Sequence, residues 1–538
     1  MSRKRRSLDV SPFSHPWTDD FWSCHPPKCL DEWLILDISR AIRNKNGWEH
    51  KLNDPEIVAK WKAEIEEQKP QSHSFEEVFE YVLQELDWYR AQQEGDLSKS
   101  GFRYSINTYI LYSDRAVSES TNQRLRILEL KLEASTAKDY HPNSNDLVVD
   151  VVHPSLYPVV YGQTEEYKNG VLSKIEYTEN IKCVKRRVLD FGVSQNFQWL
   201  PAKLVYDKDA GGFCFSSYIN NLHPIDFADL YHEIENVFNS CLSGLTRCLS
   251  HCASDEYIRV EVPTYDDAYD EKYHEKREEI DELDLTLDQE LEYDLLLEQM
   301  KPEFVKITIP LWKGGPAITP FDLTSFDHLK VIVKLANIEL TPEKPRYDGG
   351  SWHVEGTINK DIVATILYYY DVENIQDSRL SFGESIDDPK ADQGDEFYCQ
   401  YYHGINNEDL MFKAAGSEET KNGRVIVFPN VFQHHVDAFE LADKNKPGHR
   451  KVLCFFVVDP YNQLVKTSET VPPQQEEWIQ DERIIEKYFP GASGLKSVSR
   501  DEALKNREKL MAERSLAVST EIEEGYAAFY RKFALCEH

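Results

Sequence analysis

Long apolar runs are missing from this sequence, since no uninterrupted stretch reaches the roughly 18 residues that a membrane-spanning helix needs. The basic residues 1–6 are not followed by the apolar segment that is typical of a secretory signal. The ten cysteines are scattered over 538 residues, a distribution that does not suit a disulfide framework. We therefore expect a cytoplasmic protein with reduced thiols and no membrane partner. The basic residues 3–6 leave a nuclear address as the alternative.

Basic residues are also scarce. The chain has 61 Lys and Arg against 94 Asp and Glu, which gives a net charge of −33. Nucleic acids and anionic membranes carry charge of the same sign, so neither is expected as a partner. The imbalance is greatest in residues 255–303, where nineteen acidic residues accompany five basic ones. Such a segment is typical of a solvated helical insertion, and recruitment of a basic partner is the alternative.

Apolar and aromatic side chains, in contrast, are abundant. They make up 41% and 12% of the chain and indicate a globular protein. In the first third, apolar residues recur at helical spacing over residues 29–42, 54–68 and 74–94. A further helix is expected at residues 225–249, and the tail from 474 to 533 again has a helical pattern.

Between residues 304 and 460 the pattern changes to short β-like runs separated by turn signals. The expected strands are residues 305–311, 331–340, 362–370, 424–428 and 451–458. Earlier runs of the same kind occur at residues 148–152 and 199–206. Short strands at this spacing predict a β-sandwich or jelly roll.

One histidine lies between two cysteines near the end of the helix expected at residues 225–249. Cys248 and Cys252 are four residues apart, with His251 between them. No second Cys/His pair follows at zinc-finger spacing, so ordinary helix side chains are favoured over metal ligands.

The β region contains a candidate metal site. His353 and Glu355 are two residues apart, and on a strand this spacing directs both side chains to one face. Two histidines and one carboxylate hold non-haem Fe(II) and leave coordination positions open for a co-substrate and O₂. The His-x-Glu pattern alone is common by chance, so the sequence downstream decides its interpretation.

Two downstream features favour the same chemistry. The apolar run 423–429 is expected to be a strand that leads into a turn, which brings a second imidazole from His434 or His435. Arg450 then begins the apolar strand expected at residues 451–458. An arginine beside an iron site can hold a carboxylate with two hydrogen bonds, which lysine does less well.

These features, in this order, resemble the Fe(II)/2-oxoglutarate oxygenases of the prolyl-hydroxylase-like kind, which are built on a double-stranded β-helix. The sequence is more closely similar to a fungal domain-of-unknown-function family placed in that superfamily. The likeness extends from about residue 29 to about residue 480. The strings that carry it are VHPSL at 152–156, SYINNLHP at 217–224, LTP at 340–342, GGSWHVEG at 349–356, YYYD at 368–371, FPN at 428–430 and PGHR at 447–450.

The resemblance implies an α+β fold in which a double-stranded β-helix, or jelly roll, is wrapped by N-terminal and C-terminal helices. The expected regions are a helical region 1–147, a mixed α/β region 148–253, an acidic helical insertion 254–303, a catalytic β-helix core 304–470 and a helical tail 471–538.

Residue by residue, the resemblance implies that His353, Glu355 and His434 hold Fe(II). The family's string at the last position usually reads Gln-His-Arg-Val, so His435 stands where an arginine is usual and is the alternative ligand. Arg450 would bind the distal carboxylate of 2-oxoglutarate, with help from Tyr369.

The implied activity is that of a dioxygenase that consumes O₂ and 2-oxoglutarate and releases succinate and CO₂. It would oxidise an unactivated C–H bond by hydroxylation, desaturation or oxidative cyclisation. The fungal relatives suggest specialised metabolism, so the expected substrate is a small amino acid or a metabolite derived from one. The candidate pocket residues, for which core packing is the alternative role, are Asn337, Tyr347, Trp352, Asn220 and His223.

Two other functions stay open at this point. A protein side-chain hydroxylase or demethylase could recruit a basic partner through residues 255–303. A non-catalytic binding module could keep the same fold, although an intact set of three ligands together with Arg450 argues against it. The sequence does not indicate an oligomeric state.

Overall fold

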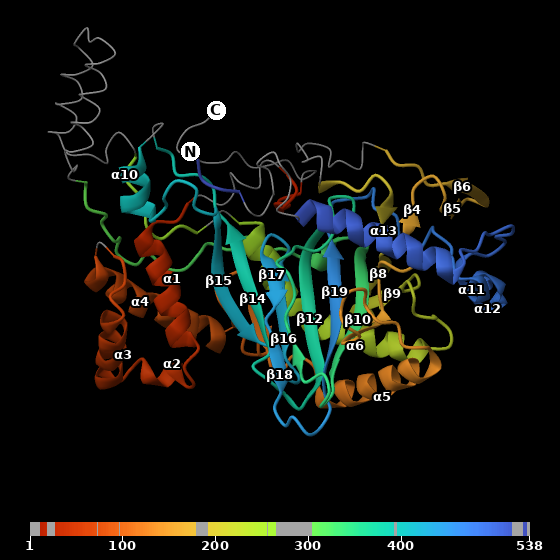
Figure 1. The fold of residues 1–538 in the computed structure, drawn as a ribbon, viewed down its shortest axis with the longest axis horizontal. Coiled ribbons are helices and arrows are strands. Elements are labelled where there is room, and N and C mark those ends of the chain that lie inside the picture. Colours follow the sequence, from red (N-terminus) through yellow and green to blue (C-terminus); the bar gives the residue numbers. More distant parts are fainter. Residues whose placement is uncertain are drawn as a thin grey trace, which may run out of the picture.

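The computed structural model describes residues 11–18, 27–72, 74–95, 97–178, 192–254, 257–264, 304–391, 395–518 and 531–534. The chain forms a large antiparallel β-sheet with long helices on one face and smaller sheets on the other (Figure 1). Most of the expected acidic insertion and the basic residues 1–6 lie outside these ranges. No helix in the described part of the chain is long and apolar enough to cross a membrane.

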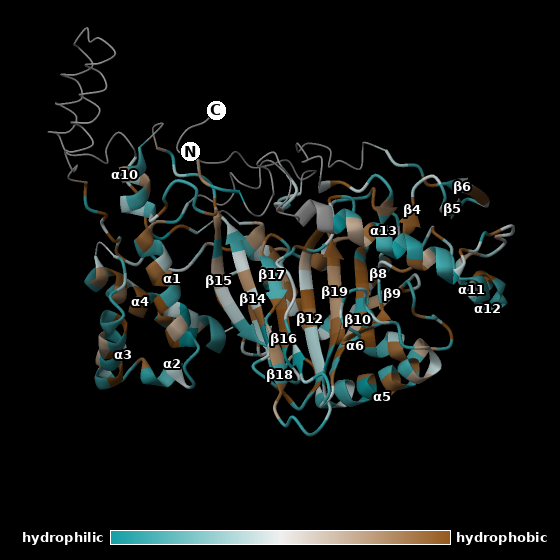
Figure 2. Cartoon of the chain, in the orientation of Figure 1, coloured by the Kyte–Doolittle hydropathy of each residue, from teal (hydrophilic) through white to brown (hydrophobic). Residues whose placement is uncertain are grey.

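The central sheet is built around three long strands, β10 (Leu329–Leu340), β12 (Ile362–Glu373) and β19 (Gly448–Val458). Strand β19 lies between the other two and pairs with both in antiparallel register. All three are rich in apolar residues, as the brown colouring of Figure 2 shows, because both of their faces are covered. The sheet continues on either side with β16 (Val425–Pro429), β2 (Leu111–Ser113), β1 (Arg103–Tyr104), β3 (Val148–Val152), β8 (Ala202–Asp207) and β9 (Gly212–Phe215).

Two three-stranded sheets accompany the central one. The first has the order β15 (Phe412–Glu419), β14 (Arg379–Ser385), β17 (Gln433–Val436). It faces the central sheet, because Phe382 of β14 packs edge-on against Phe428 of β16 at 5.0 Å. The second has the order β11 (Arg346–Tyr347), β18 (Phe439–Leu441), β13 (Ile375–Gln376). Two small two-stranded sheets are also present, β4 (Val159–Val160) with β7 (Phe197–Gln198) and the hairpin β5 (Glu165–Lys168) with β6 (Val171–Lys174).

Four N-terminal helices gather beside one edge of the sheets, at the left of Figure 1. They are α1 (Leu30–Arg43), α2 (Trp48–Lys51), α3 (Pro55–Glu67) and α4 (Phe75–Glu94). Asp54 caps α3 by accepting hydrogen bonds from the first backbone N–H groups, and Pro55 occupies the first helical position. The three helices expected from apolar spacing in this region are confirmed to within one residue at each end.

Two longer helices, α5 (Glu119–Ser135) and α6 (Ala228–Cys252), cover one face of the central sheet. Tyr368 of β12 points toward α5 and accepts a hydrogen bond from Asn122. The buried side of α6 joins the same core as the inner strands. The helix expected at residues 225–249 is therefore confirmed, with both ends displaced by three residues toward the C-terminus.

The C-terminal part returns to helices, as expected, with α11 (Glu476–Gln480), α12 (Glu482–Tyr488) and α13 (Arg500–Val518). Helix α13 lies on the face of the central sheet opposite to α5 and α6, where Leu510 joins a core cluster with Trp199 and Phe456. Three short turns lie elsewhere, a 3-10 turn at Leu323–Ser325, α10 at Glu396–Tyr398 and a π-helical turn at Cys399–His403.

The expected strand at residues 305–311 is wrong, because this segment is extended but pairs with no strand. Ile307 and Ile309 pack into the core instead, whereas Val305 and Leu311 are exposed. Ile307 is buried in the helical core, and the Val305 carbonyl accepts a hydrogen bond from Tyr402. The architecture is thus mixed helix and sheet with a large antiparallel sheet, while closure into a double-stranded β-helix and the region bounds stay predictions.

Candidate metal centre

Three side chains converge between the central sheet and the first small sheet. His353, Glu355 and His434 each offer a ligand atom, and these atoms all lie within 4.8 Å of one another. Nε2 of His353 is 3.7 Å and Nε2 of His434 is 3.6 Å from the same carboxylate oxygen, Oε1 of Glu355. The sequence-based triad is therefore brought together in space, while its role as a metal site stays a prediction.

The two histidines are held next to each other by their own backbones. His353 and His434 exchange backbone hydrogen bonds of 3.1 and 2.9 Å, and their rings are 4.4 Å apart. His353 makes this single bridge outside any regular strand, so the expected strand around it is wrong. Gly349 (φ +96°) and Gly356 (φ +71°) bend the segment on either side into the left-handed region, which ends strand pairing.

His434, rather than His435, points toward Glu355. Both lie on β17, where successive side chains alternate between the two faces of the strand. The His435 ring lies 4.2 Å from the ring of Trp352, and its Nε2 atom is 3.3 Å from Asp437. Because these contacts hold His435 on the outer face, the structure leaves His434 as the third candidate ligand.

Asn430 fixes the backbone of Glu355, a role that sequence reasoning missed. Its side-chain oxygen accepts the Glu355 N–H at 2.8 Å, and its amide donates to the carbonyls of Glu355 at 2.8 Å and Ile362 at 3.1 Å. The residue is buried in the turn between β16 and β17. Asn430 belongs to the string FPN at residues 428–430, which the sequence analysis used as evidence for the family resemblance and not as part of the metal site.

The hydrogen bond of His353 sets the ring nitrogen that faces the site. Its Nδ1 atom is 2.8 Å from the carbonyl oxygen of Ser351, which can only accept. Nδ1 therefore carries the proton, and Nε2 presents its lone pair toward Glu355. A backbone carbonyl that orients a histidine in this way is the usual outer partner of a metal ligand.

The ionisation of Glu355 and His434 also suits a cation. Burial raises the pKa of Glu355, but the neighbouring His353, His434 and Arg514 outweigh it and hold that pKa well below its usual range. Burial and the neighbouring His353 lower the pKa of His434, so this imidazole is neutral near pH 7. A carboxylate and a neutral imidazole are the forms that bind metal.

The triad opens into a cavity of about 370 Å³ on the face of the central sheet opposite to α5 and α6. Arg450 and Tyr369, expected to bind the co-substrate, and Tyr347, expected in the substrate pocket, line this cavity, while these roles stay predictions. The floor is largely apolar, and it is formed by residues such as Leu367, Val452, Cys454 and Phe456. The structure thus gathers a candidate metal site and a buried cation in one chamber.

Arg450 is buried without a carboxylate partner among the described residues. It is 4% exposed, and its guanidinium lies 5.2 Å from the ring centre of Tyr369 and 5.3 Å from that of Phe439. One nitrogen donates to the Ser378 hydroxyl at 3.2 Å, while Nε has no hydrogen-bond partner. A buried guanidinium with an unmet donor is costly, so an anionic ligand would stabilise it.

Asn337 and Trp352, expected in the pocket, do not line the cavity. Asn337 lies on the opposite face of β10, where its amide donates to Glu129 and Glu133 of α5. Trp352 precedes the first ligand but packs edge-on against Phe412 at 5.0 Å. Side-chain alternation explains both corrections, because residues of odd and even number face opposite ways along an extended chain.

Asn220 and His223 also lie elsewhere. Asn220 is buried and donates to the carbonyls of Leu156 and Tyr157, which makes it a clamp between loops. His223 lies 3.3 Å from Asp481 and edge-on to Trp478 near α11. Both therefore take the packing role that was the alternative in the sequence analysis.

Helix α13 supplies part of the cavity wall that sequence reasoning missed. Met511 and Arg514 line the cavity, and Arg514 lies 3.6 Å from Oε2 of Glu355. The guanidinium also lies over the ring of Trp199 at 4.9 Å. The sequence feature that could have indicated this wall is the three- and four-residue spacing of Leu510, Met511 and Arg514, which directs their side chains to one side of a helix.

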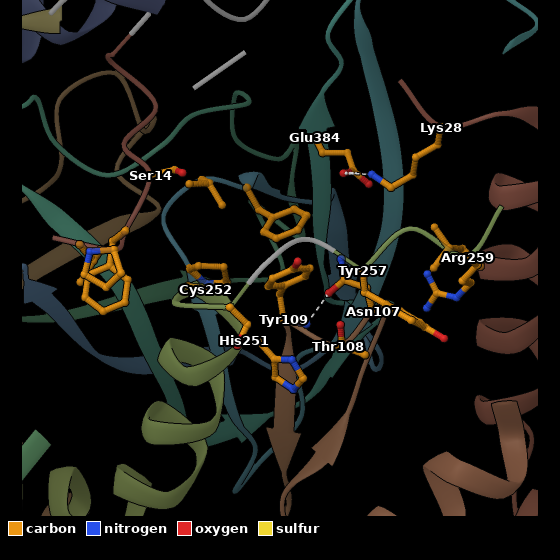
Figure 3. A pocket seen from close by; sticks show the side chains of 18 residues that line it. Ser14, Lys28, Asn107, Thr108, Tyr109, His251, Cys252, Tyr257, Arg259 and Glu384 are labelled. Atoms are coloured by element: carbon orange, nitrogen blue, oxygen red, sulfur yellow. Dashed lines mark hydrogen bonds and ion pairs between the residues drawn. The ribbon is translucent and has the colours of Figure 1, made fainter. Parts of the chain in front are cut away.

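A second cavity, of about 120 Å³, lies near the end of α6 and is lined by His251 and Cys252. Lys28 and Glu384 pair at 2.8 Å at the upper right of Figure 3, and Tyr109 and His251 lie lower in the same view. His251 bonds to the Tyr104 hydroxyl at 2.9 Å, and burial lowers its pKa to about 3. Cys248 is fully buried, and burial raises its pKa well above the usual value. The three side chains thus take ordinary helix positions.

Comparison with solved structures finds distant likenesses. A selenomethionine-labelled Fe(II)/(alpha)ketoglutarate-dependent dioxygenase, TqaL, is 8% identical over 64% of this chain and 77% of its own, with a TM-score of 0.27. IDO from Bacillus thuringiensis is 11% identical over 25% and 48%, with a TM-score of 0.17. A bsmA homolog from Methylobium petroleophilum PM1 is 10% identical over 25% and 42%, with a TM-score of 0.15.

Comparison of sequences is more decisive. No curated protein matches this chain. Two family models do match, a domain of unknown function described as DUF4246, N-terminal, over residues 2–64, and a protein of unknown function, DUF4246, over residues 76–482. The second match spans most of the chain and includes all three candidate metal ligands and Arg450. The chain belongs to the DUF4246 family.

Proposed function

We propose that this protein is an Fe(II)- and 2-oxoglutarate-dependent oxygenase of a small-molecule substrate. One observation carries the proposal: His353, Glu355 and His434 share a cavity with Arg450, a buried cation that has no carboxylate partner among the described residues. A metal site alone fits many activities. A metal site beside an unpaired guanidinium fits a co-substrate that both chelates the metal and carries a distant carboxylate.

The donor set suits Fe(II) better than a structural metal. Two imidazoles and one carboxylate on one side of an ion leave the opposite positions open, whereas a structural zinc site is usually closed by four protein ligands. Bound Fe(II) with 2-oxoglutarate and O₂ would supply the oxidation of an unactivated C–H bond, with release of succinate and CO₂. The chain's own part is to hold the ion, orient the co-substrate and exclude water.

Arg450 and its neighbours would orient the co-substrate. The rings of Tyr369 and Phe439 fix the guanidinium plane, so its fork can meet both oxygens of a carboxylate. The Tyr369 side chain lines the same space, and burial raises its pKa to about 12, so its hydroxyl keeps its proton. Tyr369 can therefore donate a further hydrogen bond to the distal carboxylate.

The surrounding residues would exclude water and admit a small substrate. The sheet contributes an apolar floor, and Trp199, Met511 and Trp17 close the sides. A cavity of about 370 Å³ suits a small molecule, such as an amino acid or a derived metabolite, more than a folded protein. We also infer that the two facing sheets belong to a double-stranded β-helix, which commonly carries such a site.

The proposal can be tested before the substrate is identified. Anaerobic titration of the protein with Fe(II), and then with 2-oxoglutarate, should produce the visible absorption of a chelated complex. Admission of O₂ should then release succinate, faster in the presence of the true substrate, which a panel of amino acids and their derivatives would sample. Glu355→Ala should lose the absorption and the succinate, while the exposed control Lys444→Ala should keep both. Absence of 2-oxoglutarate binding by the Fe(II)-loaded protein would contradict the proposal and favour a non-catalytic module.

A further inference from the structure

The charges that line the metal cavity do not balance. Glu355 is the one carboxylate among the described residues that line the cavity, whereas Lys334, Arg450 and Arg514 contribute three cations. Arg514 lies 3.6 Å from Glu355, and Arg450 is accounted for by the distal carboxylate of the co-substrate under the proposed function. Lys334 has no such partner, because no residue in the described ranges lies within ion-pair or hydrogen-bond distance of its ammonium group.

Lys334 and Arg450 lie in different parts of the cavity. Both side chains point to the same face of the central sheet, but Lys334 pairs with Cys454 whereas Arg450 pairs with Ile338. Four residues of extended chain separate the two positions, which corresponds to about 13 Å along the strands. Arg450 is also fixed at its own end by the rings of Tyr369 and Phe439. One small anion at Arg450 therefore leaves the charge of Lys334 unmet.

A second cluster of candidate metal ligands, His141, Asp150 and His153, lies beside Lys334 on the β3 side of the cavity. Its hydrogen bonds are unlike those of the first cluster. Nδ1 of His153 accepts the backbone N–H of Ser155 at 3.2 Å, so the proton of this imidazole must be on Nε2. Burial lowers the pKa of His153 well below its usual value, which keeps the ring neutral. With one nitrogen occupied and the other protonated, His153 has no lone pair for a metal.

The carboxylate of this cluster is already compensated. Asp150 accepts a hydrogen bond from Nδ1 of His141 at 2.9 Å and lies 3.7 Å from the guanidinium of Arg507 on α13. Its side chain is fully buried and does not line the cavity. The charge of Lys334 helps to lower the pKa of Asp150, but no direct contact joins the two side chains. The cluster thus forms a fixed wall behind Lys334, and the ammonium group faces the space that a ligand would fill.

We propose that Lys334 forms a second anion subsite in this cavity and binds a carboxylate group of the substrate. This inference rests on the proposed function and deepens it, since it names the substrate as a small carboxylic acid. An ammonium group offers three hydrogen-bond donors, and a charge-assisted bond in a half-enclosed cavity is stronger than one in water. The acid would lie with its charged end at Lys334 and the remainder toward the metal centre.

A paired-ligand titration tests this subsite. The protein is loaded with Mn(II), which binds such a site without turnover, and saturated with 2-oxoglutarate. N-acetylglycine, N-acetylvaline and N-acetylphenylalanine are then titrated calorimetrically, each beside its primary amide, which has nearly the same shape and no charge. At least one acid should bind about tenfold more tightly than its amide, as expected when a charge-assisted hydrogen bond is lost.

Lys334→Met should abolish this preference, since it keeps the length of the side chain and removes the charge. Lys344→Met changes a lysine outside the cavity whose side chain is 41% exposed, and it should leave the preference unchanged. The proposal is overturned if none of the acids binds, if acid and amide bind equally well, or if Lys334→Met keeps the preference. A lower melting temperature of Lys334→Met with an unchanged preference would mean that the lysine serves only the charge of Asp150.

Titration of 2-oxoglutarate into the same Mn(II)-loaded variants separates this inference from the proposed function. Lys334→Met should bind 2-oxoglutarate as the unaltered protein does. Loss of that binding would place the co-substrate at Lys334 and overturn the subsite. If the unaltered protein binds no 2-oxoglutarate, the proposed function fails, and the acid–amide comparison still decides whether Lys334 selects carboxylates.

Discussion

The guanidinium of Arg514 lies 3.6 Å from Oε2 of Glu355, while Oε1 of the same carboxylate faces the two candidate histidine ligands. The two oxygens thus have different partners, one a cation on α13 and the other the proposed position of a metal ion. This arrangement favours a carboxylate that binds through one oxygen, which preserves open positions around the ion.

The first prediction concerns separate replacement of the two adjacent histidines, His434 and His435. His434→Ala should lower Fe(II) affinity by more than 100-fold, a larger loss than the 10–100-fold that removal of an outer partner causes. His435→Ala should change it by less than about threefold, because the ring faces Trp352 and Asp437. Anaerobic competition with a coloured chelator measures both affinities. The reverse order of effects would move the ligand by one residue.

The second prediction concerns Arg450. Arg450→Met should weaken 2-oxoglutarate binding by about 2–4 kcal/mol, since it leaves the distal carboxylate unpaired, and Fe(II) binding should persist. Arg450→Lys keeps the charge but not the fork, so a partial loss is expected. Calorimetric titration of the metal-loaded variants with 2-oxoglutarate measures both changes in affinity.

The melting temperature of the ligand-free Arg450→Met variant gives an independent check. A purely structural Arg450 would pair with Asp437 or Glu440, but Asp437 accepts from Ser381 and Glu440 pairs with Lys444. Removal of a buried, unpaired charge should leave the ligand-free protein as stable as before or more so. A large drop in melting temperature with unchanged 2-oxoglutarate affinity would show a structural role instead.

The third prediction tests the clamp on Glu355. Asn430→Ala removes three hydrogen bonds, two of them to the backbone of Glu355. Metal affinity should fall about 10–100-fold, and the free energy of unfolding should fall by about 1–3 kcal/mol because buried backbone groups lose their partners. Asn445→Ala, an exposed substitution, is the control. Equal metal affinity in the two variants would show that the loop holds Glu355 without Asn430.

The fourth prediction is a pH dependence set by His251. Burial lowers its pKa from 6.5 to about 3 in the folded protein. Between these values the unfolded chain binds a proton that the folded chain does not, so stability falls as the pH falls below 6.5. The slope from this one group is about 1.4 kcal/mol per pH unit.

Replacement of His251 isolates this contribution. His251→Gln keeps an acceptor for the Tyr104 hydroxyl but cannot take up a proton. Urea unfolding between pH 6 and pH 4 should therefore give a shallower loss of stability for this variant, by about the slope of one group. The exposed His232→Gln is the control. Parallel pH profiles for His251→Gln and the unaltered protein would contradict the assignment.

The sequence correctly predicted those helices and strands that are determined by neighbouring residues. Helix α3 has its cap at Asp54 and its proline at the first turn, and β19 is a continuous apolar run, so both were found close to their observed bounds. His353, Glu355 and the pair His434/His435 were singled out because metal chemistry restricts the residue types and the spacing, and the family resemblance favoured His434 within that pair. Two short segments are then sufficient to suggest the site.

The wrong predictions concern residues whose position depends on strand register or on contacts with distant parts of the chain. Asn337 was placed in the pocket, yet only the pairing of β10 determines which of its faces meets α5. The segment 305–311 is apolar like a strand, but its partners are helical turns that the sequence does not indicate. Arg514 was missed because nothing near it in the chain relates it to Glu355.

Helix α13 also sets an order of assembly. The residues around the cavity come from positions as far apart as Trp17 and Arg514, and those on α13 are translated after every strand of the central sheet. A ribosome-bound chain that has completed β19 already holds all three candidate ligands and Arg450, but it lacks the wall made by Met511 and Arg514. During synthesis, therefore, the chamber stays open to solvent on this side until α13 emerges, so its enclosure is among the late steps of folding.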